Sequence, residues 1–348
     1  MGLFRRTPES PGPATGTDIT AFWQWWAAEG RADAERSIEG DLAPQEFAAT
    51  LAGHLDPVGP LAWELSAGDV SRHVLVVTAE SDPGLRGLAR RVVLAAPEAD
   101  GTWSYLDTRP PAADPEGIVL GSDGELIDFD RVRVSARLHG EQFDVSVHHP
   151  AFADLPAEAR ERITVLALDA ALGESGTELW IGGITASEVS PVDAFGLSAL
   201  RAVVHDLERQ HVDADGRPRW LMLQGQGPGG PLVALVRRLL RPSTAPHLDT
   251  YVSVALPYRG RDAQGLPDES SVAALEQLQQ RLTDSLGTSG EIVAHLSTGG
   301  VRTVHLYTDS TAATVPALKQ VARSWGEGRA AVHEMRDPGW EAVAHLRQ

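Results

Sequence analysis

The sequence predicts an α+β fold made of two-layer α/β sandwiches, and three observations carry this prediction. The chain has 348 residues, more than one hydrophobic core usually serves. Short apolar segments with alternating pattern are interleaved with longer segments of helical periodicity. Hydrophobic residues make up 42% and charged residues 22%, as in ordinary globular proteins. We therefore expect a flexible tail at residues 1–17, an N-terminal α+β domain at 18–212 and a C-terminal domain at 213–348.

The composition restricts partners and compartment. The net charge is −18, and an acidic surface repels a phosphate backbone, so no nucleic-acid partner is expected. The chain has no cysteine, which excludes disulfides, thiol catalysis and thiolate metal sites. The first residues lack the apolar segment of a secretory signal, and no apolar run reaches 18 residues. We expect a cytoplasmic protein without membrane contact.

The segment FWQWW at residues 22–26 concentrates aromatic side chains near the start of a predicted helix, about 18–39. Phe22, Trp25 and Trp26 stand at i, i+3 and i+4, so they share one face of that helix. Packing against the core of the N-terminal domain is the favoured interpretation. Membrane contact is less favoured because the polar face is rich in acidic residues, and a ligand platform is the third alternative.

The N-terminal domain is predicted to contain a β-β-α-β unit and a hairpin. The unit has strands at 61–66, 72–79 and 102–107 with a helix at 82–96. In the hairpin RVRVSARLHGEQFDVSVHH, a two-residue turn at His139 and Gly140 would set Val134 opposite Val145. The elements expected after the hairpin are a helix at 156–172, a strand around ELWIGGI and a helix at about 196–211.

The C-terminal third is predicted to follow the order β-α-β-β-α-β, which is the order of a ferredoxin-like sandwich. Its elements are DTYVSVALPY, the helix ending at Gly287, the hairpin of EIVAHLS and VRTVHLYT, the helix TAATVPALKQVARSW and the strand RAAVHEM. The hairpin-helix part shares its element order with residues 61–92. A weak internal repeat and chance similarity are equally compatible with this.

Several C-terminal motifs resemble a known bacterial domain, the domain of unknown function DUF695. They are LPY and GLP within 256–267, the helix after them, STGGVRTVHLYTD at 297–309 and DPGWEAV at 337–343. The resemblance covers roughly residues 215–348, and the whole chain looks like actinobacterial proteins that carry this domain last. It implies a ferredoxin-like fold; a similarity in element order to regulators of ribonuclease E is fold-level analogy only. No catalytic residues are implied.

GQGPGG at residues 225–230 is the nearest approach to a phosphate-binding loop. Gly225, Gly227 and Gly230 match GxGxxG, and Pro231 could open a helix, as a dinucleotide fingerprint requires. The lysine of a Walker loop is absent. A glycine-rich hairpin loop is preferred, because the resemblance makes 231–240 a strand.

Two His and Asp pairs are the candidates for chemistry. Asp144 and His148 share one strand face, where a carboxylate could orient a histidine for acid-base work. His247 and Asp249 stand at i, i+2 and would need a third member to bind a metal or act as a catalytic pair. His295 and His305 flank the STGG turn, and the strand register decides whether they face the same side.

Arg131, Arg133 and Arg137 form a basic strip on an acidic chain and are the first choice for a binding surface. The favoured function is a non-catalytic binding or regulatory module with no cofactor and no metal. Its partner would be an unknown protein or a small anion, and homo-oligomer formation stays open. The alternative is a hydrolase-type enzyme that uses Asp144, His148, His247 or Asp249, with or without a metal.

Overall fold

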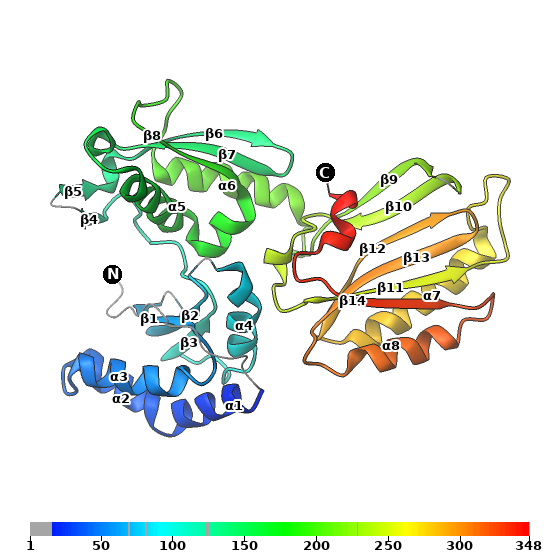
Figure 1. The fold of residues 1–348 in the computed structure, drawn as a ribbon, viewed down its shortest axis with the longest axis horizontal. Helices are drawn as coiled ribbons and strands as arrows, with labels where there is room; N and C mark the ends of the chain where they lie inside the picture. Colours follow the sequence, from blue (N-terminus) through cyan, green and yellow to red (C-terminus); the bar gives the residue numbers. More distant parts are fainter. Residues whose placement is uncertain (1–15, 69, 81, 123–124, 228, 348) are drawn as a thin grey trace. The chain divides into compact units, whose positions relative to one another are not determined.

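The structure is a computed structural model that describes residues 16–347, with residues 69, 81, 123–124 and 228 excepted. The described chain is mixed α+β, as predicted. It divides into two compact units between His205 and Asp206 (Figure 1). This division lies inside helix α6 (Leu197–His211), whereas the boundary expected from the sequence follows the end of the same helix. A flexible tail is expected at residues 1–17, and residues 1–15 of it lie outside the described residues.

The aromatic segment lies in a long helical stretch at the start of unit 1. It consists of α1 (Gly16–Trp25), a π-helical turn (Trp26–Gly30) and α2 (Arg31–Glu39), followed by α3 (Pro44–Leu55). All four aromatic side chains of FWQWW are at most 8% exposed. Trp23 Nε1 donates to the Val92 carbonyl at 2.8 Å, and Trp26 Nε1 donates to the Tyr105 hydroxyl at 3.0 Å. The prediction that this segment packs against the core is confirmed.

Unit 1 contains a β-β-α-β motif where the sequence predicts one. Strands β1 (Ala62–Ala67) and β2 (His73–Thr78) form an antiparallel hairpin. Helix α4 (Pro83–Leu94) then crosses over to β3 (Trp103–Leu106), which pairs with β2 in parallel. Asp82 caps α4 by accepting from the Gly84 amide, and Pro83 occupies the first helical turn.

A second motif of the same topology follows in unit 1. It is preceded by a small hairpin of β4 (Val119–Ser122) and β5 (Glu125–Asp128). Strands β6 (Arg133–His139) and β7 (Gln142–His148) then form an antiparallel hairpin. Helix α5 (Ala157–Trp180) leads to β8 (Ile181–Ser187), which pairs with β7 in parallel. Helix α5 is kinked at Gly173, whose φ of 74° lies in the left-handed region. The strand expected around ELWIGGI begins only at Ile181, because residues 178–180 still belong to α5.

The predicted register of the β6–β7 hairpin is wrong by two residues. Val134 pairs with Val147 rather than Val145, and the turn consists of Gly140 and Glu141. The physical reason is that the first turn position needs a positive φ. In the observed register this position is Gly140, with a φ of 62°, whereas the predicted register would place His139 in the left-handed region. A shift of two keeps every side chain on its predicted face, so the apolar face survives.

Unit 2 is a six-stranded antiparallel sheet of order β14-β11-β13-β12-β10-β9 (Figure 1). Its strands are β9 (Trp220–Gly227), β10 (Gly230–Arg237), β11 (Thr250–Pro257), β12 (Gly290–Thr298), β13 (Val301–Thr308) and β14 (Ala331–Arg336). Helices α7 (Glu269–Leu286) and α8 (Thr314–Arg323) cover one face and bury one core with β11 and β13. A second core on the other face includes Trp340 and the C-terminal 3₁₀ helix Glu341–Leu346.

The dinucleotide interpretation of GQGPGG is wrong. Residues 225–227 of this segment belong to β9 and Gly230 belongs to β10, and the two strands pair so that Pro231 lies opposite Gln226. Pro231 therefore belongs to a strand and opens no helix, and the helix N-terminus that would face a pyrophosphate is missing from this place. Among the described helices, none is both long and apolar enough to cross a membrane.

Candidate functional site

A pocket of about 640 Å³ lies at one end of the unit 2 sheet, where α8 ends and β14 begins. Four cationic side chains line it: Arg259, Lys319, Arg323 and Arg329. Apolar surface comes from Ala322, Ala330 and Val332, and Gly326 and Gly328 leave room between the cations. The volume is within the range of small-molecule sites.

Three separate segments bring these cations together. Arg259 follows β11 directly, Lys319 and Arg323 stand at i, i+4 on α8, and Arg329 precedes β14. Glu327 fixes the loop after α8, because its Oε2 accepts from the Arg259 amide at 2.9 Å and from Ser271 Oγ at 2.7 Å. Trp325 Nε1 also donates to the Pro257 carbonyl at 2.7 Å. The pocket walls are thus tied to β11 and α7.

Among the residues that the structure describes, the guanidinium groups of this pocket have no carboxylate partner. Lys319 Nζ lies 3.0 Å from Glu334 Oε2, in a pair whose side chains are both more than 40% exposed. Within the described part of the chain, no carboxylate lies within 4 Å of the guanidinium groups of Arg259, Arg323 or Arg329. Three exposed, unpaired guanidinium groups therefore share one pocket in a chain of net charge −18.

The basic strip predicted from the sequence is a different surface, in unit 1. Arg131, Arg133 and Arg137 are all exposed. Arg133 Nη1 donates to the carbonyls of Asp130 and Val132, both at 2.8 Å, so its head is held by backbone oxygens. Arg137 pairs across the hairpin with Asp144, which partly neutralises the strip.

The proposed catalytic pairs have separate partners in the structure. His148 Nδ1 lies 3.0 Å from the Ser187 carbonyl, while Asp144 Oδ2 lies 3.6 Å from His139 Nδ1 on the exposed face. Asp144 and His148 therefore share a face, as the alternation predicts, without bonding each other.

The other pair, His247 and Asp249, stands just before β11. Asp249 is 3% exposed and accepts from the amide and the hydroxyl of Ser310, both at 3.0 Å. Its Oδ2 also lies 3.3 Å from Arg336 Nη1. These bonds give Asp249 a structural role between β11, β14 and the turn after β13. His247 is half-buried two residues before it.

His295 and His305 lie on opposite faces of the unit 2 sheet, because the cross-strand partner of His295 is Val304. His295 Nδ1 is 2.8 Å from Gln279 Oε1 of α7, and His305 Nδ1 is 2.7 Å from the Tyr251 hydroxyl. Burial lowers the pKa of each imidazole to about 4. Both are neutral at physiological pH, and they form no joint site.

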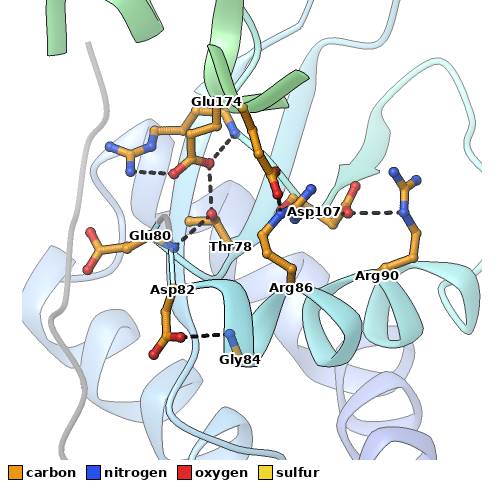
Figure 2. A network of polar contacts seen from close by, with 10 residues as sticks. Thr78, Glu80, Asp82, Gly84, Arg86, Arg90, Asp107 and Glu174 are labelled. Atoms are coloured by element: carbon orange, nitrogen blue, oxygen red, sulfur yellow. Dashed lines mark hydrogen bonds and ion pairs between the residues drawn. The ribbon is translucent and has the colours of Figure 1, made fainter. Parts of the chain in front are cut away.

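A buried polar network in unit 1 escapes the sequence-based predictions (Figure 2). Glu174 Oε2 accepts from Thr78 Oγ1 at 2.7 Å and from the Arg109 amide at 2.8 Å, and Oε1 accepts from Arg109 Nη2 at 2.7 Å. Arg86 of α4 donates to Asp107 Oδ2 at 3.3 Å and to Glu178 Oε2 at 2.9 Å. The network connects the two β-β-α-β motifs of unit 1.

Asp169 of α5 borders this network. Burial raises its pKa to about 6; the Thr177 hydroxyl and Arg109 oppose the rise, and the charge of Glu174 adds to it. One signal for the network exists in the sequence, because Gly173 interrupts a long helical segment and Glu174 follows it directly. Among the described residues, no group of three or more His, Cys, Asp or Glu is arranged to hold a metal ion.

Residues 233–345 match the family model described as a family of unknown function, DUF695. This confirms the resemblance of the C-terminal third, and every residue that lines the cationic pocket lies within the matched range. No curated protein and no solved structure matches the chain.

Proposed function

We propose that the chain is a non-catalytic binding module whose unit 2 holds a small, multiply charged anion in the cationic pocket. The observation that carries this proposal is the set of three unpaired guanidinium groups around one cavity of about 640 Å³. Arginine offers paired N–H donors that match carboxylate and phosphate oxygens. In a chain of net charge −18, a local cluster of cations creates a field that attracts anions to this place.

The walls support a ligand that is more than a bare ion. Ala322, Ala330 and Val332 give the pocket an apolar side, and the volume exceeds the need of one phosphate or carboxylate group. Lys319 is partly neutralised by Glu334, so it offers less charge than the three arginines. An organic molecule with two or more anionic groups fits both properties.

The enzyme alternative receives less support from the contacts. Asp144 and His148 bond elsewhere, and Asp249 is saturated by Ser310 and Arg336.

We further propose that β11, α7, β12, β13, α8 and β14 form a ferredoxin-like sandwich extended by the β9–β10 hairpin. The strand order and the antiparallel neighbours support this. A cytoplasmic location remains part of the proposal, and cell fractionation tests it.

Isothermal titration of the full chain at low salt with citrate and with pyrophosphate tests the pocket. We expect saturable binding of at least one of these polyanions in wild type. The double variant Arg323→Gln, Arg329→Gln should weaken that binding at least tenfold. Arg209→Gln is the matched control, because Arg209 is an exposed arginine of α6 that does not line the pocket.

A second variant tests the cavity itself. Gly326 lines the pocket, and a Cβ added there meets no atom within 4 Å, so the backbone accepts a side chain at this position and Gly326→Phe should fill part of the pocket. It should reduce binding while all four cations remain. The proposed function would be refuted by equal affinity in wild type and in both pocket variants. It would also be refuted if neither polyanion showed saturable binding.

A further inference from the structure

Arg302 is a buried arginine in the apolar stripe of β13. It lies on the helix-covered face of the sheet together with Val304 and Leu306, which are fully buried. Its neighbours across the sheet are Leu256 of β11 and Ser297 of β12. The residue is 8% exposed, so most of its side chain is shielded from water, while its Nη atoms are not among the fully buried atoms that lack a partner.

Among the described residues, no carboxylate forms an ion pair with Arg302. The Nε of Arg302 donates to Ser297 Oγ at 3.0 Å, and within the described residues no acidic oxygen lies within 4 Å of the guanidinium group. Burial lowers the pKa of Arg302, while Tyr258 and Glu276 act against this at longer range. Arginine nevertheless stays protonated in proteins. A buried charge without a partner is costly, and folded proteins rarely retain one.

The groups around Arg302 form a set of donors. Ser297 is 3% exposed, and because its oxygen accepts from Arg302 its hydroxyl hydrogen is available to another acceptor. The two Nη atoms of Arg302 offer further N–H donors in a planar fork. His295 adds no positive charge, since burial and then the charge of Arg302 hold its pKa at about 4. Its Nδ1 faces Gln279 Oε1.

We propose that Arg302 and Ser297 form a second anion site, which receives one oxyanion group, a carboxylate or a phosphate. The incoming group would supply the missing counter-charge and accept from both Nη atoms and from the Ser297 hydroxyl. None of these residues lines the cationic pocket, so the inference does not depend on the function proposed above. It explains why β13 carries an arginine on the same face as the fully buried Val304 and Leu306.

Side-chain NMR of the full chain, labelled with ¹⁵N, tests the site directly. The Nε–H resonance of Arg302 is assigned by its loss in Arg302→Met. It is then followed during titration with sodium acetate and with sodium phosphate, against sodium chloride at equal ionic strength. We expect a saturable shift with at least one of the two anions. A response to acetate alone identifies a carboxylate site, and a response to phosphate alone identifies a phosphate site.

Thermal unfolding separates a binding role from a structural one. Arg302→Met should unfold at the same or a higher temperature than wild type without anion, and the anion-induced rise in Tm should be lost. Ser297→Ala should keep the rise but require several-fold more anion. The double variant Arg323→Gln, Arg329→Gln should retain the Arg302 response. The proposal would be overturned by an Arg302 resonance whose chemical shift changes with neither anion. It would also be overturned if Arg302→Met had a lower Tm than wild type and kept the anion-induced rise in Tm.

Discussion

Two groups of charged side chains, one in each unit, differ in how they are partnered. In unit 1, Glu174, Arg86 and Asp107 are buried, and each bonds more than one partner (Figure 2). In unit 2, Arg323 and Arg329 are exposed without acidic partners, and Arg302 is buried without one. The comparison teaches that charges paired with opposite charges of the chain hold elements together, whereas cations without an acidic partner are available to an anion from outside it.

Removal of Glu174 should have the largest effect and would show that the unit 1 network is structural. Glu174→Gln leaves the guanidinium of Arg109 without its acidic partner in a buried place. We expect a loss of about 3–5 kcal/mol in the free energy of unfolding, measured with urea. Glu161→Gln is the control, because Glu161 is exposed on the same helix and should change stability by less than about 0.5 kcal/mol. Similar stability in both variants would contradict a structural network.

Asp169 should have the next largest effect, and with the opposite sign. Its pKa in the folded state is about 6, above the value of 3.8 for an unperturbed aspartate, so ionisation destabilises the fold at neutral pH. Asp169→Asn should therefore be more stable than wild type at pH 8, by about 1–3 kcal/mol. The difference should shrink as the pH falls through 6 and vanish near pH 4. Urea unfolding at several pH values checks this; a gain that is independent of pH would exclude the shifted carboxylate as its cause.

The pocket arginines should contribute little to stability, which sharpens the contrast with Glu174. The double variant Arg323→Gln, Arg329→Gln should unfold within about 0.5 kcal/mol of wild type, since these side chains are exposed and unpaired. A loss comparable to that of Glu174→Gln would mean that the pocket cations are structural after all. Parallel urea unfolding of this double variant and of Glu174→Gln measures the two losses in the free energy of unfolding.

Glu334 should have the smallest effect. Its carboxylate neutralises Lys319 across an exposed ion pair, which is worth between about 0 and 1 kcal/mol. Glu334→Gln should release Lys319 and increase the affinity of the pocket for citrate or pyrophosphate by about two- to fivefold. Titration calorimetry measures this change. Unaltered affinity would exclude Lys319 from the residues that bind the anion.

The elements of the fold are largely predictable from the sequence, because their apolar periodicity is local. The strands and helices of residues 61–107 and 250–336 lie where the pattern places them. The hairpin register is less predictable, because the placement of one positive φ at Gly140 decides it. The pocket could not be predicted, since Arg259, Arg323 and Arg329 come from three segments that only the sheet brings together. The same holds for Glu174 and Thr78, which are far apart in the chain.

The place of β14 in the sheet has a consequence for the order of folding. This strand pairs with β11 and must reach it across α7, the β12–β13 hairpin and α8. Such distant pairings form late, after local hairpins, because the chain must first close a long loop. Val332 of β14 and Ala330, the residue directly before this strand, line the cationic pocket. We therefore expect the pocket to be completed late in folding, so that an anion bound there would mark chains whose C-terminal strand has docked.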